Sequence, residues 1–238
     1  HFESMRLEAR IAAQRLWLDR FTAAIGANDR IEGRGWLDQD RRFDLQVTST
    51  GIDAAGIDWL KDRFIGQGRL QFDVAGSGSV DNPDIDGRVV LSDVSINNER
   101  FEDFSIDFSL HDRLAKASAR LNFNLEAVCD LNTGDLDGSL IFDRTETAAY
   151  FRAAGQPALH GRLSGRIAAA GNIKHLPGMT ASVDLSQVDL YYKEISLARS
   201  ERITAQLSEQ TLSIPGIDLA ILSTGRLKLN GEAHIGGQ

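Results

Sequence analysis

Strict alternation of apolar and polar residues runs through most of this chain and limits what it can fold into. In residues 69–74, for example, every second residue is apolar and the residues between are Arg, Gln and Asp. A strand points successive side chains to opposite faces, so this pattern predicts strands with one apolar and one polar face. Parallel sheets covered on both faces would need continuous apolar runs, so the alternation favours antiparallel meanders.

The residues predicted to line the apolar face come from the clearest alternating segments. They are Leu70, Phe72, Val74, Ile106, Phe108, Leu110, Leu121, Phe123, Leu125, Leu163, Ile167, Val183, Leu185, Leu227 and Leu229.

The composition excludes several functional classes. The 238 residues are 42% hydrophobic and carry a formal net charge of −8. Lys and Arg alternate with Asp and Glu and do not cluster, so we expect no nucleic-acid binding. No segment has the ~18 to 20 consecutive apolar residues that span a bilayer, and no signal peptide opens the sequence. Cys129 is the only cysteine, so no intramolecular disulfide can form, and we expect it to be a small buried hydrophobe.

Two segments depart from the alternation and predict short helices. Residues 53–64 (DAAGIDWLKDRF) place apolar residues at three- and four-residue spacings behind Asp53 as a candidate N-cap. Residues 145–154 (TETAAYFRAA) have Thr145 as a candidate cap and Gly155 as the stop. We expect five or six strands between these helices. An odd number would make the second helix a crossover to the other edge of the sheet.

The tripeptide GRL follows both predicted helices and indicates a repeat. An offset of 93 residues aligns the two GRL segments and their neighbouring glycines. After one inserted residue, the alignment places Pro83 on Pro177 and Leu91 on Leu185.

The beginning of the chain matches its end at a second offset, of 196 residues. Leu7 falls on Ile203 and Gln14 on Gln210. Residues 6–25 could form an arginine-rich helix if taken alone, but this match predicts strands. The chain then holds the rear part of one repeat (1–51), a complete repeat (52–144) and most of a third (145–238), all in one continuous β domain.

Two segments resemble a known family. They are 68–96 (GRLQFDVAGSGSVDNPDIDGRVVLSDVSI) and 161–190 (GRLSGRIAAAGNIKHLPGMTASVDLSQVDL). Each follows a predicted helix, and together they resemble the repeats of the AsmA-like superfamily, in particular its TamB family. The resemblance is one of repeat style and covers most of the chain. It implies an elongated antiparallel β-taco, a repeating β-groove with short helices between its units.

The resemblance also implies a function. The family's groove conducts phospholipid between the inner and outer membranes of a diderm bacterium. We would then expect a periplasmic part of an inner-membrane-anchored protein, with a TamA-like outer-membrane barrel as partner and a role in outer-membrane protein assembly. Contacts with that barrel and with the membranes would use regions outside this sequence.

An apolar face is physically suited to that task. Each acyl methylene that leaves water for an apolar surface gains about 0.8 kcal/mol, while charged head groups stay at the open seam. Such a path needs no catalytic residue or cofactor, so we expect no enzyme activity. Two other classes stay open. One is a scaffold that pairs exposed strand edges with nascent β proteins, and the other is a passive stalk whose apolar residues form a closed core.

Other motifs favour ordinary structural roles. The five histidines lack metal-ligand spacing, and GSGS at 76–79 lacks the lysine of a P-loop and predicts a bulge or turn. The acidic stretches 81–87 and 130–138 do not place their oxygens as a calcium loop does and predict hairpin turns. Trp17, Trp36 and Trp59 lie in separate segments and are expected to be packing residues.

Overall fold

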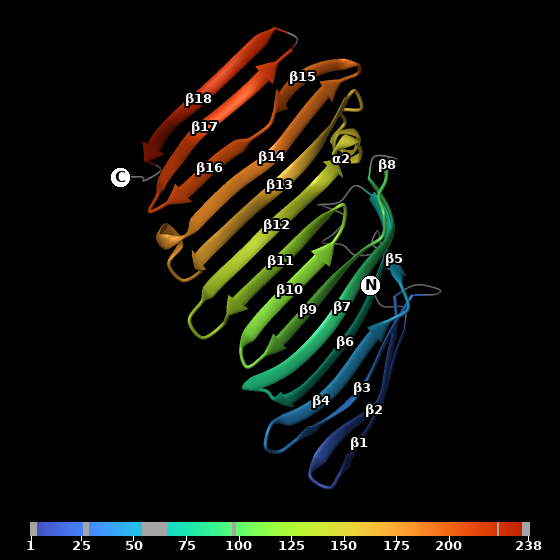
Figure 1. The fold of residues 1–238 in the computed structure, drawn as a ribbon. Helices are drawn as coiled ribbons and strands as arrows, with labels where there is room; N and C mark the ends of the chain where they lie inside the picture. The colour runs from blue at the N-terminus through green and yellow to red at the C-terminus, as the bar shows by residue number, and fades with distance from the viewer. Residues whose placement is uncertain (1–3, 26–28, 54–65, 97–98, 223, 235–238) are drawn as a thin grey trace. The chain divides into compact units, whose positions relative to one another are not determined.

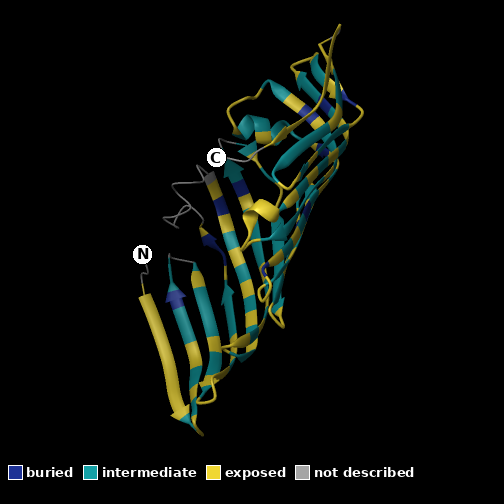
Figure 2. Cartoon of the chain, turned by 90° about the vertical axis from the view of Figure 1, so that its left-hand side faces the viewer, coloured by how far each residue is buried: buried dark blue, intermediate teal, exposed yellow. Residues whose placement is uncertain are grey.

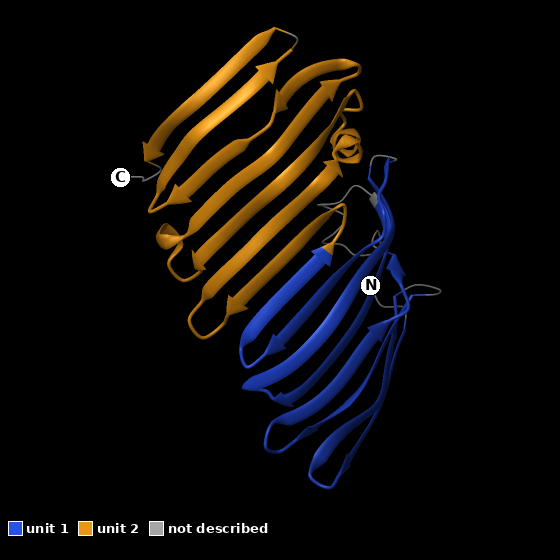
Figure 3. Ribbon diagram, viewed as in Figure 1, with its two compact units in different colours: residues 1–119 blue, residues 120–238 orange. Residues whose placement is uncertain are grey.

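The computed structural model describes residues 4–25, 29–53, 66–96, 99–222 and 224–234. Nearly all of them lie in antiparallel β-sheet (Figure 1), which confirms the all-β fold expected from the alternation. The chain divides into two compact units, His1–Ala119 and Arg120–Gln238 (Figure 3).

Unit 1 is a meander in which each long strand pairs antiparallel with the next. Its strands are β1 (Ser4–Ala12), β2 (Arg15–Ala24), β3 (Arg30–Asp38), β4 (Arg42–Ser49), β5 (Ile52–Asp53), β6 (Gly66–Ser79), β7 (Asn82–Ile96), β8 (Glu99–Arg100), β9 (Phe104–His111) and β10 (Leu114–Arg120), whose last residue belongs to unit 2. The two-residue strands β5 and β8 extend the pairing along β6 and β7.

Unit 2 is a second antiparallel meander. Its elements are β11 (Phe123–Asp130), β12 (Asp135–Glu146), α2 (Ala148–Ala153), β13 (Leu159–Asn172), η2 (Leu176–Gly178), β14 (Thr180–Tyr192), β15 (Ile195–Ser200), β16 (Ile203–Ser208), β17 (Thr211–Ile221) and β18 (Gly225–His234). Both β15 and β16 pair with β14 and with β17, so they act as one interrupted strand.

The 196-residue offset is matched by hairpin turns. Ala13 and Gln14 join β1 to β2 with φ of 50° and 61°. Glu209 and Gln210, 196 positions later, join β16 to β17 with φ of 49° and 61°. Positive φ at both central residues is the type I′ geometry, whose twist suits antiparallel strands. The prediction that residues 6–25 form strands is confirmed.

The same offset also relates the irregularities of the sheet. The register of β2 with β3 shifts between Leu18 and Phe21, and that of β17 with β18 shifts between Ile214 and Ile217. The register of β1 with β2 shifts between residues 8 and 9, and that of β16 with β17 shifts between residues 204 and 206. Bulges set the local bend and twist of strands, so the first and last strands of the described chain share their backbone path as well as their polarity pattern.

The 93-residue alignment needs a correction after its inserted residue. Phe72 pairs with Val89, whereas Gly165, 93 positions after Phe72, pairs with Leu185. Leu185 is therefore equivalent to Val89 and not to Leu91. A slip of two residues leaves every side chain on its own face, so the alternating pattern alone does not detect it.

The second predicted helix is shorter than expected. Thr145 lies in β12 and is buried, where its hydroxyl donates to the carbonyl oxygen of Asn122 at 2.6 Å. The helix α2 has Thr147 as its N-cap, and Gly155, with φ of 75°, follows its end as predicted. It connects β12 and β13, which pair directly, so it is no crossover. The first predicted helix, at residues 53–64, lies outside the described residues except for Asp53, which ends the short strand β5.

Three turn predictions were wrong, one of them entirely and two in part. GSGS at 76–79 pairs regularly within β6, opposite residues 82–85 of β7. The acidic stretch 81–87 belongs to β7 from Asn82 onward, because its Asx residues alternate with apolar ones. In the stretch 130–138, the carboxylate of Asp130 accepts hydrogen bonds from the backbone nitrogens of Asn132 and Thr133, so only its first half is a turn.

Each unit is a single layer of sheet with little buried interior. Among the described residues, the buried apolar side chains are those of Ala23, Ile52, Val94 and Ala119, and no large side chain is fully enclosed (Figure 2). None of the described helices is long and apolar enough to cross a membrane.

Candidate functional site

Strand pairing in unit 1 lines up the apolar residues in rows that cross seven strands. From β1 to β9, one row runs through Leu7, Phe21, Gly33, Val47, Val74, Gly87 and Phe108. The row beside it runs through Ala9, Leu18, Gly35, Leu45, Gly76, Ile85 and Leu110. Directly opposed residues share a face, so these rows form one continuous apolar surface.

The structure brings together the six unit 1 residues predicted for this face. Leu70, Phe72 and Val74 on β6 join Ile106, Phe108 and Leu110 on β9 through β7. The β7 residues between them, Ile85, Val89 and Leu91, were missed from the sequence. Gly87 and the doublet Val89–Val90 interrupt the alternation there, although Ile85 and Val89 still follow its phase.

Aromatic rings lie against glycines on this face. An ideal Cβ on Gly87 would stand 2.2 Å from Cζ of Phe108, and one on Gly76 would stand 3.2 Å from a ring carbon of Phe43. The rings thus occupy the space that side chains would fill at these glycines. The glycines let the rings lie close to the sheet and keep the apolar surface low.

Unit 2 has an equivalent apolar face. One row runs through Phe123, Phe142, Gly165, Leu185, Ile203, Ile217 and Leu229, and the next through Leu125, Leu140, Ile167, Val183 and Ala205. Leu163 stands opposite Val188 and Leu227 opposite Leu219, while Leu121 precedes β11. Cys129, expected to be buried, is only half-buried opposite Leu136 because no second layer covers it among the described residues.

Large apolar side chains on the apolar faces of both units remain accessible to solvent. Leu7 and Met5 on β1 are 65% and 62% exposed, and Leu227 and Leu229 on β18 are 45% and 46% exposed. Most of the other apolar residues in the rows are half-buried. Contiguous apolar surface of this kind marks a site of interaction in a soluble protein.

The opposite face of unit 1 is polar and holds two of the tryptophans. Trp17 and Trp36 pair across β2 and β3 with ring centroids 6.4 Å apart. The guanidinium groups of Arg10 and Arg15 lie 4.9 and 4.1 Å from the Trp17 and Trp36 ring centroids. These tryptophans pack as expected, but with each other and with arginines. Trp59 lies outside the described residues.

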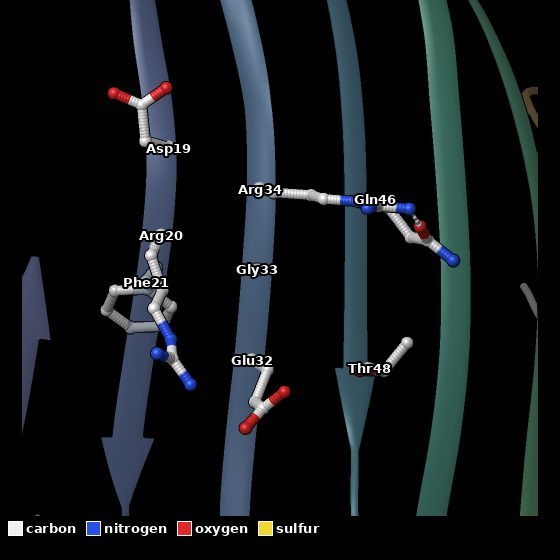
Figure 4. A pocket seen from close by; sticks show the side chains of 8 residues that line it. All are labelled: Asp19, Arg20, Phe21, Glu32, Gly33, Arg34, Gln46 and Thr48. Atoms are coloured by element: carbon white, nitrogen blue, oxygen red, sulfur yellow. Dashed lines mark hydrogen bonds between the residues drawn. The ribbon is translucent and has the colours of Figure 1, made fainter. Parts of the chain in front are cut away.

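The bulge in β2 opens a depression of about 350 Å³ on unit 1 (Figure 4). Its lining comes from β2, β3 and β4 and includes Arg20, Glu32 and Arg34. In Figure 4 the Arg34 side chain reaches across to Gln46, whose Oε1 accepts from Nη2 of Arg34 at 2.8 Å.

The repeat provides a test of whether this depression is a binding site. A depression of about 380 Å³ lies at the equivalent bulge of unit 2. There, 196 residues on, Arg20 is replaced by Gly216 and Glu32 by Lys228. The shape recurs while the charges differ, so the depressions follow from the bulges and share no ligand chemistry.

No group of three or more His, Cys, Asp or Glu side chains within the described ranges could hold a metal ion. No family model, curated protein or solved structure matches the chain. The resemblance to the AsmA-like superfamily therefore stays a prediction.

Proposed function

We propose that this chain is a lipid-conducting segment of a periplasmic AsmA-like protein, and that its apolar faces hold phospholipid acyl chains in transit between the inner and outer membranes. The observation that carries the proposal is the open apolar face of each unit. Rows of aliphatic and aromatic side chains lie on a single layer and have few buried members among the described residues. A TamA-like partner and a role in outer-membrane protein assembly rest on the resemblance and remain predictions.

The dimensions of the rows suit an acyl chain. Seven strands spaced ~4.8 Å apart span about 29 Å from first to last. One leaflet of a bilayer is about 15 Å deep in hydrocarbon, so an extended acyl chain fits along one row. Each methylene that covers the row contributes about 0.8 kcal/mol.

The passive-stalk alternative fits the structure less well. A stalk gains its stability from inward residues packed against each other, as in a close-packed protein interior. Here Phe108 and its row neighbours Gly87 and Val74 are only half-buried. Acyl chains would supply the contacts that a second layer supplies in a closed core.

Lipid extraction tests the proposal directly. The 238-residue chain would be purified without detergent and its bound lipid measured by mass spectrometry. We expect co-purified phospholipid in the wild type and less in Phe108→Asp, because the new carboxylate lies in the acyl path. Ser105→Asp is the matched control, since Ser105 lies on the same strand opposite Val90, on the polar face. A wild-type protein free of lipid would contradict the proposal.

A further inference from the structure

Three hairpin turns, which join β1 to β2, β3 to β4 and β6 to β7, lie at one end of the unit 1 strands (Figure 1). We call these turns, at residues 13–14, 39–41 and 80–81, the turn rim. The apolar side chains nearest to it are strongly exposed: Ile11 83%, Leu16 48%, Leu37 42% and Val80 48%. Ile11, Leu16 and Leu37 stand opposite each other in one row.

Toward the other end of the strands, the apolar face of unit 1 is buried on β2, β5 and β7. Ala23 near the end of β2, Ile52 in β5 and Val94 near the end of β7 have exposures of 0%, 3% and 8%. On these inner strands the accessible apolar surface therefore increases from this end toward the turn rim, whereas the first strand, β1, is exposed along its length, with Met5 at 62% and Leu7 at 65%. A ligand that reaches β2 to β7 from the ends of the strands therefore meets less obstruction over the turn rim than at the opposite end.

The turn rim also carries charges of both signs. Arg41 pairs with Asp81 at 3.0 Å, and Arg42 with Asp40 at 3.3 Å. All four side chains are more than 60% exposed. The backbone nitrogen of Val80 donates to the carbonyl oxygen of Arg41 at 2.9 Å, which ties two of the turns together.

Exposed ion pairs are weakly held, since water screens both partners. A guanidinium can exchange its carboxylate for a phosphate, with which it makes equally good charged hydrogen bonds. The released carboxylate can then accept from an ammonium group. A ligand that carries both a phosphate and an amine can therefore bind the arginine of each pair through its phosphate and the aspartate through its amine.

We propose that zwitterionic phospholipid enters the apolar face of unit 1 over the turn rim, with its head group exchanging into the Arg41–Asp81 and Arg42–Asp40 pairs and its tails passing Leu37 and Val80. The inference rests on the proposed function and adds to it a point of entry and a head-group class. Carboxylates beside the arginines disfavour a purely anionic head group.

Uptake kinetics test the entry point. The full chain would be mixed with phosphatidylcholine vesicles containing a trace of tail-labelled fluorescent phosphatidylcholine, and the initial rate and final amount of uptake recorded. Leu37→Asp and Val80→Asp should slow the initial rate about tenfold, because the tails must pass a charge. Ile195→Asp in unit 2 is the matched control, since Ile195 is 57% exposed and lies outside the turn rim. It should leave the initial rate unchanged. Circular dichroism checks that each variant is folded.

Head-group choice tests the charge pairs. The double variant Arg41→Gln with Asp81→Asn should reduce the preference for phosphatidylcholine over phosphatidylglycerol vesicles that we expect of the wild type. A wild type that takes up lipid at the same rate as Leu37→Asp and Val80→Asp, or that prefers phosphatidylglycerol, would overturn the inference and leave the proposed function standing. A wild type that takes up no lipid at all would overturn both.

Discussion

The stability of Phe108→Asp distinguishes an open apolar face from a closed core. Phe108 lies in the middle of β9 on the apolar face, half-buried, with its ring over Gly87. Full burial of a phenylalanine side chain contributes roughly 1.5–3 kcal/mol, so a half-buried ring accounts for about 1–1.5 kcal/mol. The substituted carboxylate can still reach water from an open face, which keeps the charge penalty near ~1 kcal/mol. We expect a total loss of about 2 kcal/mol.

A closed core predicts a much larger effect. Truncation of a buried phenylalanine alone costs about 3–5 kcal/mol, before any penalty for a buried charge. Urea unfolding followed by circular dichroism would measure the difference. With a slope of about 2 kcal/mol per molar urea, the open face predicts a midpoint shift of about 1 M. Phe108→Ala, measured in parallel, separates the lost contacts from the charge. A loss above ~4 kcal/mol, or a variant that does not fold, would refute the reasoning.

Three further predictions concern single positions. Nε2 of His111 lies 3.0 Å from a carboxylate oxygen of Asp86. The hydrogen bond to Asp86, and to a lesser degree the one to Asp84, raises the pKa of His111. The stability that these hydrogen bonds contribute is present below the ordinary histidine pKa of about 6.5 and is lost as pH rises through the raised pKa. Because Asp86→Asn removes the carboxylate, NMR titration should show a lower His111 pKa in that variant. Gly35→Ala should destabilise unit 1 by more than ~2 kcal/mol in urea unfolding, because the new Cβ would stand 2.2 Å from the backbone oxygen of Asp44; an unchanged midpoint would argue against this close approach. Gln14→Gly should raise the melting temperature, since glycine removes a left-handed penalty of about 1 kcal/mol at φ of 61°, and a lowered melting temperature would count against the type I′ turn.

The sequence alone determined where most of the strands lie and which face most of their residues occupy. Alternation is a local property, because each strand residue points opposite to its neighbour whatever it pairs with. The predicted residues from Leu70 to Leu110 therefore lie together on one face of unit 1. The sequence also predicted that the helix ends before Gly155. It predicted strands for residues 6–25 because they match the last strands of the chain.

Only the tertiary structure decided register, bulges and openness. The repeat alignment placed Leu185 on Leu91, but strand pairing makes it equivalent to Val89. An alternating pattern cannot detect this error, because a shift of two residues leaves each side chain on the same face. Thr145 joined β12 and not the helix, because a hydrogen bond to Asn122 and pairing with Leu163 hold it in the sheet. Whether Phe108 lies in a closed core or on an open surface depends on whether a second layer covers it. The alternating pattern is the same in both cases, because it records which side of a strand is apolar and not what lies against that side.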